Sequence, residues 1–369
     1  MEKIIKNQEK LFYLLTLLIA GVFLLTIYSG RGHISQKFDY KIWENKYDKS
    51  QWVVPQSKNE ISDEDLYIFV GAKLVNGYDP SLVNAEMPPL GKYLIGISDS
   101  VFGYIGVYGI VMSLAALILF FILNKLLFKS NLVAVIPVFL LAIDPQFREQ
   151  IGVSLLDIQY LSLLLLTFIL FLKKKYLWAG ISAGLFMATK SPFMVVVLYA
   201  TFFGYFIVRK DFKFRNWVSM PIATFVAYTL VSIKMFFLGH SLRYFLSVQH
   251  YMINFYQTGA TGIRGAVFPL LLTGYWFTLF NRNGFISDWS PVWPVALILT
   301  LLAFCKIARS RKVEDGFLLI GIWVILYMIF LIFTPVFPRY LLLAVPFMYN
   351  LSVWVLLKTI KSSHLHLSS

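Results

Sequence analysis

The feature that most constrains this chain is a series of apolar runs that are as long, or nearly as long, as a membrane is thick. A helix needs roughly 20 mostly apolar residues to cross the lipid core. Ten runs are predicted spans: residues 11–29, 100–123, 131–143, 154–172, 176–190, 191–208, 216–238, 291–305, 316–334 and 340–357. We therefore predict an all-α polytopic membrane protein that forms a single domain over residues 1–369.

Composition supports a membrane protein, but the positive net charge leaves a nucleic-acid-binding protein to be excluded. Charged residues make up 14% of the chain, against about 25% in soluble domains. The net charge of +14 would also suit a nucleic-acid-binding protein. The single cysteine, Cys305, excludes an intramolecular disulfide, and no Cys/His cluster has the spacing of metal ligands.

The placement of the positive charge decides between the two classes. Short segments that alternate with the remaining loops hold 18 of the 33 Lys and Arg residues, which is typical of cytoplasmic loops. These segments are residues 1–10, 124–130, 173–175, 209–215, 306–315 and 358–369. Both termini are thus predicted to be cytoplasmic, and no nucleic-acid partner is expected. No small-residue cleavage site precedes Arg31, so the first span is predicted to be retained.

Two long loops, residues 30–99 and 239–290, then lie on the extracytoplasmic side. Loops of this length are usually functional. Within the first loop, Ser62–Val75 is predicted to be a short amphipathic helix with a Ser/Asp cap. Residues 266–280 are apolar, but a crossing there would place the later basic loop outside, so we expect this segment in the outer interface or re-entrant.

An acidic triplet, Asp63, Glu64 and Asp65, opens the helix predicted in the first loop. Acidic residues favour the first turn of a helix, which is one sufficient explanation. A carboxylate at a membrane interface can also serve as a general base for an incoming hydroxyl. Asp63 and Asp65 further form an Asp-x-Asp pair that could hold a divalent cation. The residues alone leave these roles open.

A second motif, Glu86-Met-Pro-Pro-Leu-Gly-Lys92, follows some twenty residues later. The prolines predict an extended segment and then a helix opened by Pro89. Such a helix start, together with Lys92, is a natural anion site. A plain interfacial helix with a lysine that reaches for the surface fits as well.

Several charged residues lie where a membrane protein rarely places them. Asp157 lies about one turn inside a predicted span, where an ionisable residue usually faces a cavity or a partner. Arg148 is a candidate partner for Asp157 or Asp144. Lys190 and Arg339 are predicted on the outer side, although basic residues of membrane proteins gather mainly in cytoplasmic loops. They suit either a lipid-linked phosphate or lipid headgroups.

Two further features are a group of small residues within a predicted span and a histidine in the second outer loop. The small residues Gly180, Ala183 and Gly184 predict close helix packing. His250 shares the second outer loop with several aromatic residues. It is a candidate for sugar binding, and the same residues also fit the aromatic belt of an interface.

In order, these motifs resemble those of protein O-mannosyltransferases. Asp63-Glu64 and Glu86-Met-Pro-Pro-Leu-Gly-Lys92 resemble the acidic pair and the His-Pro-Pro-Leu-Gly-Lys motif of that family, with Met87 in place of the histidine. Weaker matches follow at Arg148 to Asp157, Ala179 to Lys190, Asp288 to Pro294 and Phe337 to Pro346. The resemblance implies a GT-C fold, with about ten transmembrane helices and two long extracytoplasmic loops that contain interfacial helices.

The resemblance also implies an inverting glycosyltransferase that uses a polyprenyl- or dolichyl-phosphate sugar, with Asp63 as base and Glu64 beside it. Glu64, Asp65 and Glu86 would orient the acceptor or sugar, or hold a metal, and Asp157 and His250 would belong to the substrate site. The protein mannosyltransferases need no metal, so no cofactor is expected, and a cation at Asp63/Asp65 is less favoured. The acceptor is a protein, a glycan or a lipid. The cations matching or near those that hold the lipid phosphate in the family are Lys92, Arg148, Lys190 and Arg339.

A transporter or flippase for a lipid-linked or anionic substrate is the alternative function, since it would also explain Asp157 and the outer cations. Transporters often contain paired repeats and broken helices near the membrane midplane. Here the polar residues gather in two loops at one face. That asymmetry favours an enzyme, and a non-catalytic subunit would differ in tolerating substitution of the carboxylates.

Overall fold

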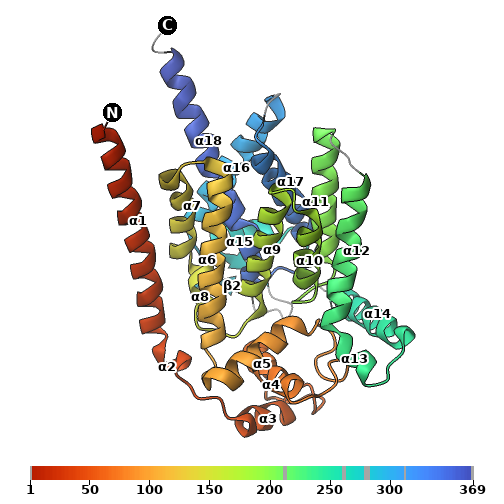
Figure 1. Cartoon of the computed structure of the whole chain (residues 1–369). Coiled ribbons are helices and arrows are strands. Elements are labelled where there is room, and N and C mark those ends of the chain that lie inside the picture. The colour runs from red at the N-terminus through yellow and green to blue at the C-terminus, as the bar shows by residue number, and fades with distance from the viewer. Residues whose placement is uncertain (1, 211–213, 260–262, 278–282, 311–312, 367–369) are drawn as a thin grey trace.

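A computed structural model of the chain describes residues 2–210, 214–259, 263–277, 283–310 and 313–366. Long apolar helices stand side by side as a bundle, and shorter helices lie across one end of it (Figure 1). Among the described residues, four helices are long and apolar enough to span a membrane by themselves, and shorter apolar helices stand between them. The bundle helices are α1 (Glu2–Ser29), α6 (Val107–Phe128), α7 (Asn131–Ile143), α9 (Leu156–Leu172), α10 (Tyr176–Met187), α11 (Met194–Arg209), α12 (Phe214–Val231), α16 (Val292–Arg309), α17 (Asp315–Phe333) and α18 (Val345–His366).

Each predicted span coincides with one of these apolar helices, but two of the predicted boundaries were wrong. The span predicted at 100–123 begins only at Val107, because the preceding interfacial helix runs on and ends at Gly103, whose φ of 73° permits a left-handed cap. The span predicted at 216–238 breaks at Ser232, after which α13 (Ile233–Phe237) is a separate short helix.

The segment predicted to lie in the interface does not cross the membrane as a helix. It contains α15 (Val267–Thr273), which has seven residues and is therefore only about 10 Å long. β1 (Tyr275–Trp276) follows and pairs antiparallel with β2 (Gly284–Phe285). Residues 278–280 of the predicted segment lie outside the described residues.

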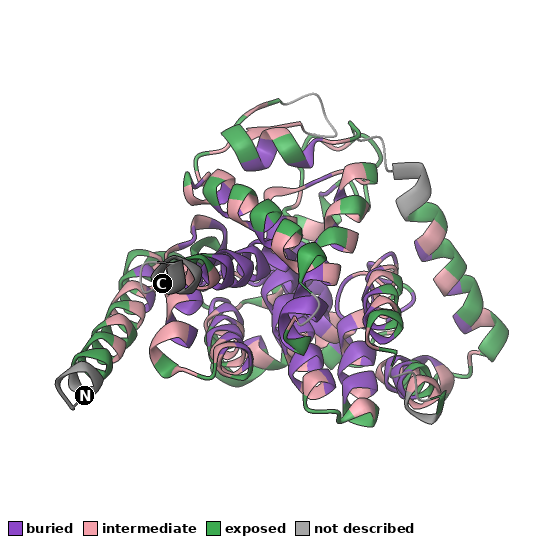
Figure 2. Cartoon of the chain, turned by 90° about the horizontal axis from the view of Figure 1, so that it is seen from above, coloured by how far each residue is buried: buried purple, intermediate pink, exposed green. Residues whose placement is uncertain are grey.

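The centre of the bundle is α9, which is buried on nearly every side. Its Phe168 packs edge-on against Trp323 of α17, with ring centroids 5.6 Å apart, and tilted against Phe347 of α18, with ring centroids 5.4 Å apart. By contrast, α1 stands at the edge and is mostly exposed (Figure 2). Its outward-facing leucines, such as Leu17 and Leu25, form the kind of apolar surface that marks a membrane contact.

Close helix packing at the small residues is confirmed for α10 and α12. A Cβ atom on Gly180 would lie 2.5 Å from the carbonyl oxygen of Met220, and one on Gly184 would lie 2.5 Å from that of Thr224. The Thr224 hydroxyl in turn donates to the carbonyl of Gly180 at 2.8 Å. These glycines let two helix backbones touch.

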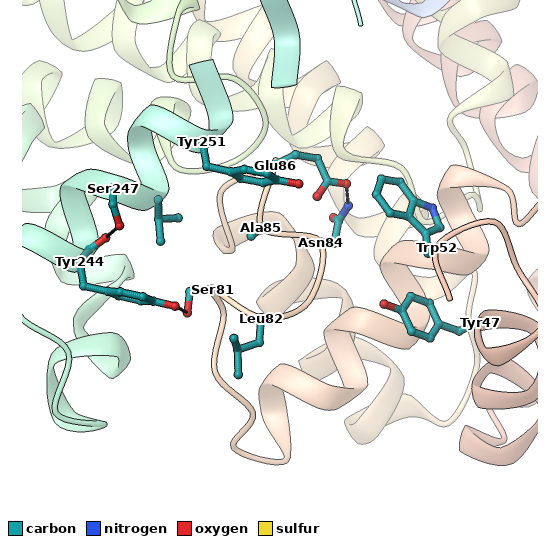
Figure 3. A pocket seen from close by; sticks show the side chains of 11 residues that line it. Tyr47, Trp52, Ser81, Leu82, Asn84, Ala85, Glu86, Tyr244, Ser247 and Tyr251 are labelled. Carbon is teal, nitrogen blue, oxygen red and sulfur yellow. Dashed lines mark hydrogen bonds between the residues drawn. The ribbon is translucent and has the colours of Figure 1, made fainter. Parts of the chain in front are cut away.

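The polar layer across the end of the bundle comes mainly from the first long loop. It contains α2 (Arg31–Ile34), α3 (Tyr40–Asp48), α4 (Asp63–Val75) and α5 (Leu90–Phe102). Ser62 caps α4 by accepting from the Asp65 N–H at 3.1 Å, as the sequence predicts. From the second loop, α14 (Leu242–Gly259) lies against residues 81–86 (Figure 3), where the hydroxyls of Tyr244 and Ser81 are 3.1 Å apart.

The predicted helix in the first loop forms, but its amphipathic character does not. Most residues of α4 from Leu66 to Leu74 are buried on all sides of the helix. At one contact, a Cβ atom on Gly71 would lie 2.5 Å from the Lys92 carbonyl oxygen of α5, and one on Gly96 would collide with the Gly71 carbonyl. The helix is thus a core element of the polar layer, because α5 packs directly against its backbone.

Candidate active site

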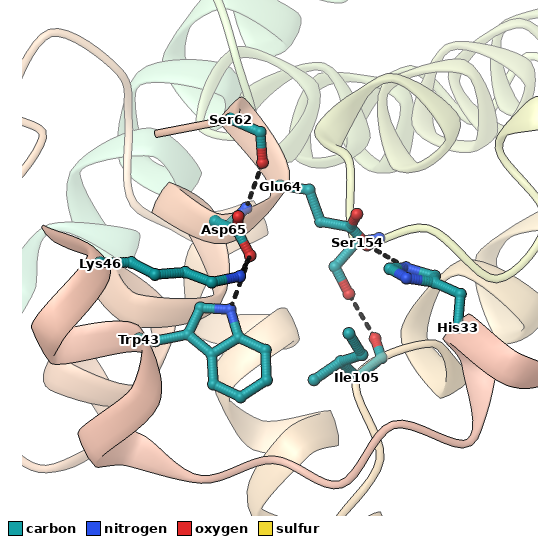
Figure 4. A network of polar contacts seen from close by, with 8 residues as sticks. All are labelled: His33, Trp43, Lys46, Ser62, Glu64, Asp65, Ile105 and Ser154. Atoms are coloured by element: carbon teal, nitrogen blue, oxygen red, sulfur yellow. Dashed lines mark hydrogen bonds and ion pairs between the residues drawn. The ribbon is translucent and has the colours of Figure 1, made fainter. Parts of the chain in front are cut away.

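The first turn of α4 sends its three carboxylates in different directions. Glu64 accepts from the Ser154 N–H at 2.9 Å and pairs with the His33 ring at the same distance. Asp65 accepts from the Trp43 indole at 3.0 Å and from the Lys46 ammonium at 2.8 Å (Figure 4). Both carboxylates therefore hold α4 to neighbouring parts of the polar layer, whereas Asp63 contacts Arg339.

This arrangement bears on two expectations for the triplet. Glu64 was expected to act beside the base and to orient the acceptor or sugar; its contacts in the structure are with His33 and Ser154, and that role stays a prediction. A cation between Asp63 and Asp65 was the less favoured option. The geometry gives it no support, because Asp65 is paired with Lys46 while Asp63 is paired with Arg339. The expectation of a metal-independent reaction stays a prediction.

A chain of alternating charges runs from the polar layer into the end of the bundle. Arg339 lies on η1 (Pro338–Leu343), a 3-10 helix just before α18. Its guanidinium donates to the Asp63 carboxylate, and its Nε lies 3.4 Å from Asp157 of α9. Asp157 also accepts from Lys190, of the α10–α11 connection, at 2.5 Å. The structure thus brings together four of the residues singled out in the sequence.

Burial differs sharply along this chain of charges. The side chains of Asp157 and Lys190 are each 7% exposed, whereas that of Asp63 is 42% exposed. Buried charges require partners, and here two carboxylates face two cations. The accessible carboxylate is therefore Asp63, and the cations lie behind it.

Two residues that contact the predicted site residues, Tyr340 and Asn84, were not predicted from the sequence. The Lys190 ammonium lies 4.7 Å from the centre of the Tyr340 ring, an arrangement that favours a cation over an aromatic face. Asn84 accepts from Lys92 and donates to Glu86. Tyr340 follows Arg339 directly, so a search for aromatic neighbours of the cations could have found it. No local signal marks Asn84.

Lys92 is not placed to hold a phosphate. It is fully buried, and its ammonium donates to the carbonyls of Asn84 at 2.7 Å and Met87 at 2.8 Å and to the Asn84 side chain at 3.1 Å. Burial lowers its pKa to about 7. Since three acceptors already take its three N–H groups, the structure assigns Lys92 to the support of the loop around Glu86.

Arg148 and His250 also lie apart from the charge chain. Arg148, on α8 (Pro145–Glu149), donates to the Thr26 hydroxyl of α1 at 3.3 Å. Asp144 instead accepts from Trp293 at 2.7 Å and Tyr349 at 2.6 Å, so the predicted pairing of Arg148 with Asp144 or Asp157 was wrong. His250 is exposed on α14.

The fold is similar to those of solved membrane enzymes. ArnT from Cupriavidus metallidurans bound to undecaprenyl phosphate matches with a TM-score of 0.61 and 15% identity over 92% of this chain and 60% of ArnT. Its apo state matches with a TM-score of 0.55 and 16% identity over 91% and 60%. The archaeal oligosaccharyltransferase AglB from Archaeoglobus fulgidus, in complex with an inhibitory peptide and a dolichol-phosphate, matches with a TM-score of 0.54 and 14% identity over 96% of this chain and 51% of AglB.

The fold and the charged site together define an integral, multi-pass membrane glycosyltransferase of the GT-C class. The match to glycosyltransferase family 87 covers residues 88–335, and the chain belongs to this family. A search of curated proteins gives no match. The predicted GT-C fold and enzyme class are confirmed. The family to which the chain belongs is glycosyltransferase family 87, whereas the resemblance to protein O-mannosyltransferases rests on short motifs alone. The chain spans 60% or less of the length of the solved proteins it resembles.

Proposed function

We propose that this protein transfers a hexose, of mannose type, from a polyprenyl- or dolichyl-phosphate sugar to an acceptor hydroxyl at the extracytoplasmic face. The observation that carries the proposal is the contact of Asp63 with Arg339, which places an accessible carboxylate directly beside a cation. The solved proteins of similar fold were captured with undecaprenyl phosphate and with dolichol-phosphate, which supports a lipid phosphate as the donor's leaving group.

In the proposed mechanism Asp63 takes the proton of the acceptor hydroxyl. The acceptor oxygen attacks the anomeric carbon, the bond from that carbon to the phosphate oxygen breaks, and the phosphate leaves with the electron pair. A single displacement inverts the anomeric centre. The phosphate needs no strong general acid at neutral pH, so the larger demand is for cations that stabilise its charge. Arg339 and Lys190 are the cations near Asp63 that meet this demand.

The ion pair between Asp63 and Arg339 has to open for this reaction. A lipid phosphate competes with Asp63 for the Arg339 guanidinium, which can bind phosphate through two N–H groups. Release from Arg339 then leaves the Asp63 carboxylate available to the acceptor. Donor binding thereby prepares the base.

The extracytoplasmic placement rests on charge and on shape. Both termini lie at one end of the bundle, and the polar layer with Asp63 lies at the other (Figure 1). The basic segments predicted to be cytoplasmic include both termini. The site is therefore proposed to face away from the cytoplasm.

The test uses the purified full chain in lipid nanodiscs with a panel of radiolabelled polyprenyl-phosphate sugars. Lipid-phosphate release is measured with and without a chelator, in the presence of mixed protein, glycan and lipid acceptors. We expect release from a hexose donor, undiminished by chelator and lost in Asp63→Asn. Release from none of the donors would overturn the proposal.

A further inference from the structure

A cavity of about 400 Å³ opens between α3, residues 81–86 and α14 (Figure 3). Small-molecule sites usually have volumes of roughly 300–1,000 Å³. Four aromatic side chains line this one: Tyr47, Trp52, Tyr244 and Tyr251. Glu86 and Asn84 add a carboxylate and an amide. The mechanism above uses none of these six residues.

The cavity is electrostatically linked to the proposed base. Glu86 is only 3% exposed, and burial raises its pKa, with a smaller contribution from the charge of Asp63. The link is also geometric, because the Tyr67 hydroxyl, one turn after Asp63 on α4, donates to the sulfur of Met87, the neighbour of Glu86, at 3.1 Å. The helix that carries Asp63 is thus joined to the loop that lines the cavity, while Asp63 itself contacts Arg339.

The walls of the cavity are held in place by direct contacts. Asp79 pairs with His240 at 2.5 Å, and the His240 ring stacks on Tyr244 with centroids 4.1 Å apart. The Tyr244 hydroxyl is hydrogen-bonded to that of Ser81, which holds the start of α14 against residues 81–86. On the floor, Asn84 donates to Glu86 and accepts from buried Lys92. A site built in this way binds without first paying for its own ordering.

The chemistry of the lining selects a sugar over a peptide. Flat aromatic faces suit the C–H surface of a pyranose ring, and the carboxyl, amide and hydroxyl groups suit its hydroxyls. One common way to bind an extended peptide is to add it to an open strand edge. In the described part of the chain the named strands are β1 and β2, and neither lines this cavity.

We infer that this cavity is an acceptor subsite that binds a saccharide, so that the acceptor of the transfer is a glycan or the glycan part of a glycolipid. The inference rests on the proposed function, since it names the class of acceptor for that reaction. Trp52 and Tyr251 supply stacking faces, and Glu86 binds hydroxyls.

Binding is tested without any donor, so that it does not depend on catalysis. Fluorescently end-labelled di- and trisaccharides of mannose, glucose and galactose are titrated into the full chain in nanodiscs. We expect saturable binding of at least one of them to the native protein. Trp52→Ala and Tyr251→Ala should each weaken binding at least tenfold. Leu246→Ala is the matched control, because Leu246 is as exposed as Tyr251 on α14 but does not line the cavity.

Transfer kinetics separate this inference from the proposed function. In Trp52→Ala and Tyr251→Ala we expect kcat/KM for a saccharide acceptor to fall at least tenfold, whereas in the control Leu246→Ala it stays within twofold of native. Saccharide binding that is equal in the native and variant proteins overturns the inference alone. Displacement of the saccharide by a serine-containing peptide or by the donor lipid also overturns it. Absence of donor cleavage in the native protein overturns the proposed function, whereas the binding titration still decides whether the cavity takes a sugar.

Discussion

Arg339 and Asp63 are separated by 276 positions in the sequence, yet the guanidinium of Arg339 donates a hydrogen bond to the carboxylate of Asp63. One residue begins a helix of the polar layer and the other lies just before the last bundle helix. Their contact joins the two parts of the molecule at the site. The proposed base therefore reaches its cationic neighbour only when nearly the whole chain has folded.

Replacement of the base is the most direct test. Asp63→Asn keeps the shape of the side chain and removes its proton acceptor, so transfer should fall by about 10²–10⁴-fold. Donor binding should persist, because Arg339 and Lys190 remain. Release of labelled lipid phosphate measures the first effect and donor titration the second. Near-native transfer by this variant would rule out Asp63 as the base. Asp65→Asn, two positions further along the chain and paired with Lys46, serves as the control and should keep most of the transfer rate.

Arg339 should control the affinity for the donor. Arg339→Gln leaves the phosphate with one fewer cation, and we expect KM for the donor to rise at least tenfold. Arg339→Lys should be intermediate, because a lysine carries the charge but lacks the planar fork that contacts both Asp63 and Asp157. Initial rates over a range of donor concentrations measure both variants. Arg31→Gln, an exposed arginine of α2, is the control. An unchanged KM in Arg339→Gln would contradict the assignment.

Lys92 should matter for stability. Lys92→Met removes the ammonium and leaves three buried acceptors without their donor and Glu86 without its countercharge, a loss of about 3 kcal/mol. Thermal unfolding in nanodiscs should show a clearly lower Tm, whereas Lys41→Met, on the exposed surface of α3, should stay near native. If Lys92 bound the donor phosphate instead, the variant would keep its Tm and raise KM for the donor.

Asp99 of α5 should make stability depend on pH. Its carboxylate oxygens have no hydrogen-bond partner among the described residues, and burial, with a smaller effect of Glu64, raises its pKa to about 8. Between about pH 4 and pH 8 the folded protein therefore binds more protons than the unfolded chain, so the free energy of unfolding falls as pH rises through this window. Above pH 8 this contribution stays constant.

Asp99→Asn removes this titration. We expect its Tm to change less than that of the native protein between pH 5 and pH 8.5 in a series of thermal melts. Asp48→Asn, an exposed residue of α3, should follow the native curve. Parallel curves for the native protein and Asp99→Asn would show that Asp99 does not titrate in this range.

Much of the fold could be predicted because its signals are local. Apolar runs of sufficient length fixed the positions of the bundle helices, and Ser62 and Pro89 marked the starts of α4 and α5 correctly. Boundaries failed at Gly103 and Ser232, where a turn interrupts a run that remains apolar on both sides. Hydropathy alone does not register such a break.

The site was predicted less completely because its geometry depends on distant partners. Four members of the charge chain were named from the sequence, yet nothing near the triplet indicated that His33, Ser154 and Lys46 would engage Glu64 and Asp65. Lys92 was expected either to bind an anion at the helix start or to reach for the surface. Its burial follows from the fold of residues 84–87 back over it, which only the assembled structure shows.

The touching backbones of α4 and α5 have a dynamic consequence. At Gly71 and Gly96 the two helices approach so closely that neither can slide without the other, so they move as one rigid unit. That unit carries Asp63 at one end and, through Lys92, the loop with Glu86. The proposed base and the floor of the cavity therefore rest on the same support, so a movement of this unit would carry both together.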